Sequence, residues 1–107
     1  MKTSSGLKAE ILAALAHPNR IRIVEFLRND VLCNCELAPA LELEQSNLSH
    51  HLKILVGAGI LKSWKEGLRV NFEVADRRIF RILDIAASIA QREIEKKSEA
   101  MDERKSP

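Results

Sequence analysis

Residues 44–61 read EQSNLSHHLKILVGAGIL, and their spacing predicts a short amphipathic helix. At about 100° per residue, a helix drawn through it places Leu48, Leu52 and Leu55 together on one buried side. The opposite side carries amide, hydroxyl and cationic groups and no carboxylate. A helix with such a face suits the major groove of DNA, where base edges need hydrogen-bonding partners and phosphates need positive charge. The predicted reading residues on this helix are Gln45, Ser46, Asn47, Ser49, His50 and Lys53.

Three further helices are expected before this reading helix. Residues 7–16 form the first, and the His17-Pro18 pair separates it from a second helix that runs to about residue 28. Proline is favoured at the first position of a helix, so Pro18 opens the second one. Residues 33–41 form a short third helix, and residues 42–45 make the turn into the reading helix. The last two helices therefore form a helix-turn-helix.

After Gly59 the apolar period changes from that of a helix to that of a strand. Leu68, Val70, Phe72 and Val74 alternate with polar residues, which predicts a half-buried strand over residues 68–74. Residues 60–65 form its partner, and residues 66–67 form the turn. A two-stranded ribbon after a helix-turn-helix is a wing. The residues that its tip offers to a phosphate backbone or a minor groove are Lys65 and Arg69.

Residues 76–97 return to a helical pattern with an unusually wide apolar arc. One packing face cannot hide so much apolar surface, so we expect part of it to pack within the domain and part against a second copy of the chain. The charged residues 98–107 are expected to form a flexible tail. Residues 1–97 would then form one DNA-binding and dimerisation domain.

Composition agrees with a single small domain. The chain has 107 residues, of which 46% are hydrophobic, and its apolar runs stay well below the ~18 residues that a membrane span needs. The first residues, MKTSSGLKAE, lack the apolar stretch of a secretory signal. We therefore expect a cytoplasmic protein without a membrane partner. In that reducing compartment, Cys33 and Cys35 are expected to remain thiols.

Positive charge is concentrated where the reading helix and the wing lie. The net charge of the whole chain is only +2, yet residues 45–81 carry seven lysines and arginines against three acidic residues. Such a concentration is the electrostatic pattern expected of a segment that binds phosphates.

The order of these elements resembles the ArsR/SmtB family of repressors. The segments that carry the resemblance are LAALAHPNRIRIVEFL, LCNCEL, QSNLSHHLKILVGAGIL and RVNFEV. The resemblance implies a mainly α fold with a small β-wing, a winged helix-turn-helix. It also implies a homodimer on double-stranded operator DNA, joined through the first and last helices. The residues expected at that interface are Leu7, Ile11, Ile82, Ile85 and Ile89.

The LCNCEL segment is similar to the motif in which arsenic- and cadmium-sensing members of that family place thiolates. Cys33 and Cys35 match it, which implies trivalent arsenic or another soft metal ion as the inducer; no resident cofactor is required. The third cysteine of one arsenic-sensing type is replaced here by Ala38, and the last helix has no histidine for a zinc site. A two-sulfur site, completed by water, another side chain or the inducer's own substituent, remains.

Other interpretations of the same residues stay open. The two cysteines could instead be small buried residues of a repressor that responds to no ligand, or a thiol-based redox switch. The winged helix could serve only protein contacts, although the local positive charge argues against this. The sequence has no glycine-rich phosphate loop and no aligned nucleophile and base, so we do not expect an enzyme.

Overall fold

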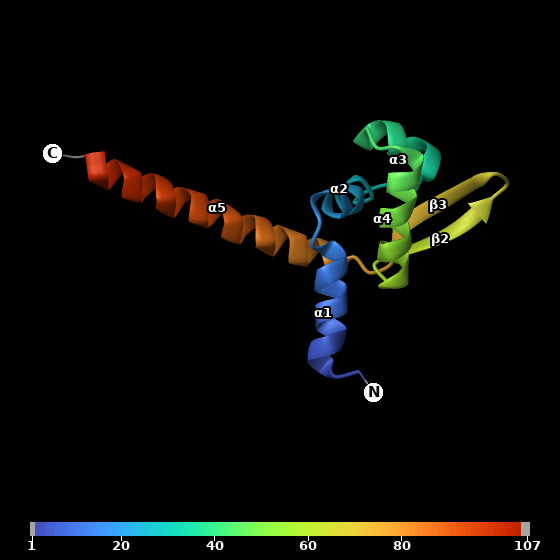
Figure 1. The fold of residues 1–107 in the computed structure, drawn as a ribbon, viewed down its shortest axis with the longest axis horizontal. Coiled ribbons are helices and arrows are strands. Elements are labelled where there is room, and N and C mark those ends of the chain that lie inside the picture. Colours follow the sequence, from blue (N-terminus) through green and yellow to red (C-terminus); the bar gives the residue numbers. More distant parts are fainter. Residues whose placement is uncertain (1, 106–107) are drawn as a thin grey trace. The chain divides into compact units, whose positions relative to one another are not determined.

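The computed structural model describes residues 2–105, and it describes the side chains of residues 2–101. It consists of two compact units, Met1–Arg77 and Arg78–Pro107. The first unit holds four helices and a small sheet, and the second is one long helix (Figure 1).

The first two helices begin at residues whose side chains cap them. Helix α1 spans Ser4–Leu15, and it starts before the predicted residue 7 because the Thr3 hydroxyl oxygen accepts a 3.0 Å hydrogen bond from the Gly6 N–H. Helix α2 spans Pro18–Phe26, with proline in its first turn as predicted. His17 Nδ1 accepts a 3.1 Å hydrogen bond from the Asn19 N–H at its start.

Helices α3 and α4 form the predicted helix-turn-helix. Helix α3 spans Asn34–Leu41 and α4 spans Gln45–Gly57. Glu42 ends α3 in the left-handed conformation, with a φ of 55°, and so turns the chain toward α4. Gly59 has a φ of 79° just after α4, a conformation that glycine adopts without strain.

The sheet has three antiparallel strands in the order β1-β3-β2. Strand β2 spans Leu61–Glu66 and β3 spans Arg69–Val74, so the predicted wing is present. The third strand, β1, consists of only Leu32–Cys33, and it pairs Cys33 with Asn71 of β3. Two residues are too few to show a period of two, and for this reason the sequence did not reveal β1.

The tip of the wing differs by one residue from the prediction. The turn consists of Gly67 and Leu68, with Gly67 at a φ of 62°, and β3 begins only at Arg69. Leu68 therefore does not belong to the apolar side of β3. Its side chain is fully exposed, with a relative accessibility of 104%, whereas Phe72 and Val74 are buried.

The core of the first unit lies between its helices and the sheet. Apolar side chains from every helix of the unit meet there, and the largest fully buried ones are Ile23, Val24, Cys33, Leu37, Leu41, Leu48, Leu55 and Ile60. Leucines of α4 thus form part of the centre of this core. Their burial fixes the rotation of α4 about its own axis and hence the direction of its outer face.

Helix α5 spans Arg78–Lys105, so it continues past the predicted end at residue 97. Residues 98–105, predicted to be a flexible tail, are helical, and residues 106–107 lie outside the described part. Isoleucines on this helix remain accessible in the single chain: Ile85, Ile89 and Ile94 are each 61% exposed.

Candidate nucleic-acid interface

Helix α4 presents the polar face that its sequence predicts. Leu48, Leu52 and Leu55 are at most 3% exposed, so the leucine side is sealed in the core. The predicted reading residues are all exposed on the same helix, and they are Gln45, Ser46, Asn47, Ser49, His50 and Lys53. The structure brings these six side chains together on one accessible surface that contains no carboxylate.

A buried histidine lies directly beside this face. His51 is 5% exposed, and its ring lies 4.5 Å from the ring of His17 at the start of α2. Its Nδ1 has no hydrogen-bond partner within the described residues. Burial lowers the pKa of His51 below 6.5, and the nearby charges of His17, Arg20 and His50 lower it further. His51 is therefore neutral at pH 7, and it forms part of the packing between α4 and the start of α2.

The wing offers the two cations that were predicted at its tip. Lys65 and Arg69 are exposed and lie at the ends of β2 and β3, on either side of the turn. Lys62, farther from the tip, forms a 3.3 Å ion pair with Glu73 across the two strands. Glu66, the last residue of β2, faces Arg69 across the two strands, so the tip carries two cations and one carboxylate, while the base of the wing carries a balanced pair.

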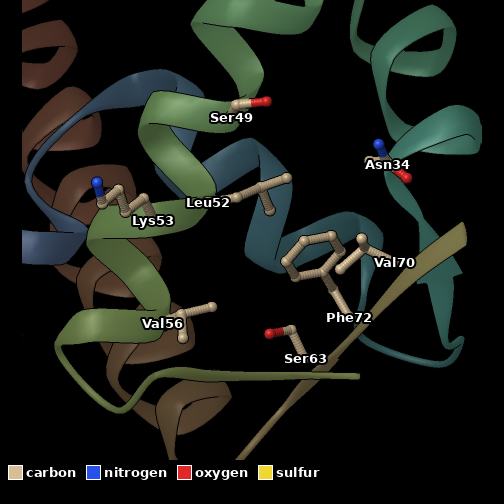
Figure 2. Close-up of a pocket in the computed structure, with 8 residues that line it drawn as sticks. All are labelled: Asn34, Ser49, Leu52, Lys53, Val56, Ser63, Val70 and Phe72. Atoms are coloured by element: carbon tan, nitrogen blue, oxygen red, sulfur yellow. The ribbon is translucent and has the colours of Figure 1, made fainter. Parts of the chain in front are cut away.

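A cleft of about 320 Å³ separates α4 from the wing. Figure 2 shows Leu52 and Val56 of α4 directed toward β3, where Val70 and Phe72 face them. The polar lining residues stand around this apolar floor. Ser49 and Asn34 lie at one end of the cleft and Ser63 lies at the other, while Lys53 projects from α4 (Figure 2).

Two of these cleft residues, Asn34 and Ser63, were not predicted as site residues. Asn34 is the first residue of α3, and Ser63 lies in the middle of β2. The strand period could have placed Ser63 on the same side of β2 as Leu61. No sequence signal shows that the start of α3 reaches the side of α4, because that contact depends on the tertiary packing.

The expectation that the two cysteines remain thiols is wrong for this structure. A disulfide bond joins Cys33 and Cys35, whose Cα atoms are 5.2 Å apart. Cys33 is fully buried as the last residue of β1, whereas Cys35 is exposed in the first turn of α3. The irregular strand-to-helix junction brings the sulfurs together, although residues two apart on a regular helix would point about 200° apart.

In this form neither sulfur is available as a thiolate ligand. Among the described residues, no group of three or more His, Cys, Asp or Glu side chains lies close enough to hold a metal ion. The described residues therefore do not fit a metal site closed by three or four protein ligands from one chain. Within the described residues, the reduced pair offers a soft ion two sulfur ligands.

Comparison with known proteins agrees with this architecture. Residues 17–63 match the model of the family described as "Bacterial regulatory protein, arsR family". The uncharacterized HTH-type transcriptional regulator MJ1325 of Methanocaldococcus jannaschii is 37% identical over 78 residues, which cover 72% of this chain and 88% of that protein. The chain belongs to the arsR family.

Another relative is a longer protein. The transcriptional repressor SmtB homolog of Synechocystis is 35% identical over 74 residues, which cover 69% of this arsR-family chain. The match spans only 56% of that repressor, so the chain corresponds to about half of its length. Both relatives are named as regulators, in line with the prediction that the chain is not an enzyme.

Solved structures show the same fold. Rv0081 of Mycobacterium tuberculosis superimposes with a TM-score of 0.80 at 32% identity and covers 92% of this chain and 99% of its own. The cadmium metal-sensor CMTR from the same organism has a TM-score of 0.60 at 38% identity, covering 71% and 79%. A homodimeric winged helix-turn-helix domain from Mycobacterium bovis, 22% identical, shares the fold with a TM-score of 0.71, covering 79% of each chain.

The residues predicted at the dimer interface of this arsR-family chain lie on α1 and α5. Leu7 is 48% exposed, Ile82 is 37% exposed, and Ile85 and Ile89 are 61% exposed. Ile11 is half-buried. These apolar side chains are accessible in the single chain, and the interface itself stays a prediction. No helix in the described part is both long enough and apolar enough to cross a membrane.

Proposed function

We propose that this chain is a sequence-specific DNA-binding repressor that acts as a homodimer on duplex operator DNA. The observation that carries the proposal is the exposed face of α4, which is free of carboxylates and held in place by three buried leucines. Two copies related by two-fold symmetry would place their α4 helices in successive major grooves, ~34 Å apart. The exposed Lys65 and Arg69 of each wing would contact the flanking backbone or minor groove.

A salt titration tests the DNA-binding part of the proposal. A palindromic operator is first selected from random duplexes with the reduced protein. Its affinity and that of a scrambled duplex are then measured by fluorescence anisotropy between 50 and 300 mM salt, roughly the range over which counterion release dominates. We expect both affinities to fall steeply with salt and the operator to bind at least ~1,000-fold more tightly. Failure to bind any duplex at low salt would contradict the proposal.

For the inducer, we propose that a soft metal or metalloid, with trivalent arsenic as the first candidate, binds the reduced Cys33 and Cys35. Arsenous acid would form two As–S bonds and lose two hydroxyl groups, which leave as two waters with the two thiol protons. The cadmium-sensing relative supports a soft ion of this class, as that protein is named a cadmium metal-sensor.

A second candidate is thiol oxidation, and the disulfide between Cys33 and Cys35 favours it. One experiment separates the two inputs. Reduced protein on its operator is titrated with arsenite, with cadmium and, separately, with diamide. Release by arsenite or cadmium alone supports the ion, and release by diamide alone supports oxidation. A Cys33→Ser, Cys35→Ser variant is the control, and any release that persists in it cannot come from this pair.

A further inference from the structure

The cleft between α4 and the wing has the chemistry of a phosphate-binding site on DNA. Its polar groups are the Asn34 amide and the Ser49 and Ser63 hydroxyls, all of which can donate hydrogen bonds. Lys53 also lines the cleft, and its ammonium extends from the other side of α4 (Figure 2). No carboxylate lines it. Side chains of these types make most protein contacts to the DNA backbone. The cleft also lies between the two elements that the proposed function places on DNA.

Asn34 occupies a special position among these four residues. It is the one residue between Cys33 and Cys35, so its backbone belongs to the small covalent ring that the disulfide closes. Cys33 is buried and paired with Asn71 in the sheet, which anchors one side of that ring. Cys35 is exposed and is the second residue of α3. A change in the bond between the sulfurs therefore acts directly on the Asn34 backbone.

A second link runs through the sheet. Leu32, next to Cys33, pairs with Phe72 of β3, and the Phe72 ring forms part of the cleft floor. The cysteine pair is thus connected to the cleft twice: Asn34, which follows Cys33, lines the cleft, and Leu32, which precedes Cys33, pairs with a residue of the cleft floor. Ser63 lines the same cleft from β2, where it pairs with Phe72, and it lies outside the ring that the disulfide closes. Ser63 is therefore the comparison for a cleft hydroxyl whose own backbone the disulfide does not constrain.

We propose that Asn34 binds a backbone phosphate of duplex DNA in this cleft, and that the bonding state of Cys33 and Cys35 controls DNA affinity through Asn34. The inference rests on the proposed DNA-binding function and names the residue that connects its two sites. With the thiols reduced, the Asn34 backbone can adjust so that its amide reaches the phosphate. Closure of the ring removes that freedom, because the backbone torsions of Asn34 become restricted.

The switching step balances with a two-electron oxidant such as diamide. The two thiols lose two protons and two electrons as the S–S bond forms, and diamide accepts them to become the corresponding hydrazine. Dithiothreitol reverses the step by transferring two electrons and two protons to the protein, and it is converted to its own cyclic disulfide. Both forms of the protein can therefore be prepared and compared on the same DNA.

The test compares Asn34→Ala and Ser63→Ala with the wild-type chain in both redox forms. Operator affinity is measured by anisotropy, with the free thiol content verified in each sample. Loss of one phosphate hydrogen bond should weaken binding by the reduced protein about 3- to 10-fold in either variant. Only in Asn34→Ala should the difference between reduced and oxidised forms disappear, so that its reduced form binds like the oxidised wild-type protein. Ser63→Ala should keep the full ratio.

An Asn34→Asp variant distinguishes a lost phosphate contact from a loss of DNA affinity that is caused by destabilised protein. A carboxylate in the first turn of α3 stabilises that helix, since it faces the positive end of the helix dipole. It should nevertheless repel a phosphate, so operator affinity should fall further than in Asn34→Ala while the free energy of unfolding is unchanged or raised. Unaltered DNA affinity in both Asn34 variants would overturn the phosphate contact.

Failure of this inference can be distinguished from failure of the proposed function. If the wild-type chain binds its operator and responds to diamide, and Asn34→Ala shows the same redox ratio, the coupling through Asn34 is wrong while the repressor remains. If the wild-type chain binds but its two redox forms have equal affinity, the coupling is likewise overturned. If the wild-type chain binds no DNA, the proposed function itself fails.

Discussion

At the scale of single residues, the outer face of α4 combines side chains that suit different parts of DNA. Lys53 carries a mobile positive charge and no fixed geometry, so it suits a phosphate. His50 and Asn47 have hydrogen-bonding groups in fixed planes, which suit base edges. All three are exposed on the same helix in the structure.

Replacing these residues should therefore produce two kinds of loss. Lys53→Ala should weaken binding to operator and random DNA alike and reduce the slope of log affinity against log salt by about one. Asn47→Ala or His50→Ala should cost ~1–3 kcal/mol on the operator only and relax specificity at particular bases. Anisotropy titrations on both duplexes at several salt concentrations measure this, and equal losses on both duplexes in all variants would refute the division.

His51 makes stability depend on pH. Burial lowers its pKa in the folded chain below 6.5, so below that pH the unfolded chain binds a proton that the folded chain does not. The free energy of unfolding should thus be unaffected by His51 above about pH 7.5 and fall as the pH drops, by at most ~1.4 kcal/mol per pH unit for one proton. Urea denaturation at pH 5.5, 6.5 and 7.5 measures the slope.

A matched pair of variants isolates this effect. His51→Leu removes the buried titrating group, so its slope between pH 7.5 and 5.5 should be shallower than that of the wild-type chain. His50→Gln removes the weakest of the charges that lower the pKa of His51, so its slope should stay much closer to the wild-type slope than that of His51→Leu. The explanation is wrong if His51→Leu retains the wild-type slope.

At the scale of elements, the register of the wing has a measurable consequence. Leu68→Ser should leave the free energy of unfolding within about 0.5 kcal/mol of the wild-type value, because the Leu68 side chain is fully exposed in the turn. Phe72→Ala should cost about 3–5 kcal/mol, because Phe72 is 6% exposed. Chemical denaturation compares the two. Similar losses would show instead that residue 68 packs on the apolar side of β3, as the alternation alone suggested.

The reading helix and the wing show what sequence can and cannot predict here. The reading helix is a 13-residue element with a regular leucine spacing, with Gly57 as its last residue and Gly59 just after it, so its burial and its outer face could be predicted. The wing was predicted from its alternation, but the turn was displaced by one residue, because Gly67 forms the first turn position and not the last. Strand β1 is too short to have a period.

The candidate site was predictable to a similar degree. The reading residues follow from the helical period of α4 alone, so all six appear where the sequence placed them. The disulfide and the position of Asn34 depend on the strand-to-helix junction at Cys33, where neither helical nor strand geometry applies. The extension of α5 to Lys105 was missed because its last turns are charged and lack an apolar stripe.

At the scale of the whole molecule, the accessible isoleucines of α5 provide a test of the proposed homodimer. Ile82, Ile85 and Ile89 lie within about 60° of one another on the helical wheel, so they form one stripe. Ile89→Glu should place a charge in the proposed interface, convert the protein to a monomer at micromolar concentration and lower operator affinity at least ~10-fold, since each half-site would be bound separately. Equilibrium sedimentation measures the association.

Ile94→Glu is the matched control. Ile94 is as exposed as Ile89, at 61%, but it lies more than 100° from the stripe on the wheel. This variant should remain a dimer with the affinity of the wild-type chain. A monomeric wild-type protein, or equal effects of the two substitutions, would contradict an interface formed by the stripe.

The short β1 strand and the strand order β1-β3-β2 leave the outer edge of β2 without a bonded neighbour in the sheet. An open edge of this kind can recruit another strand and so start fibrous aggregation. Lys65 lies on β2 with an exposed side chain, and its charge opposes the approach of an identical edge, whereas the charge of Lys62 is balanced by Glu73. Replacing Lys65 by threonine is therefore expected to favour edge-to-edge polymers, so this lysine contributes to solubility.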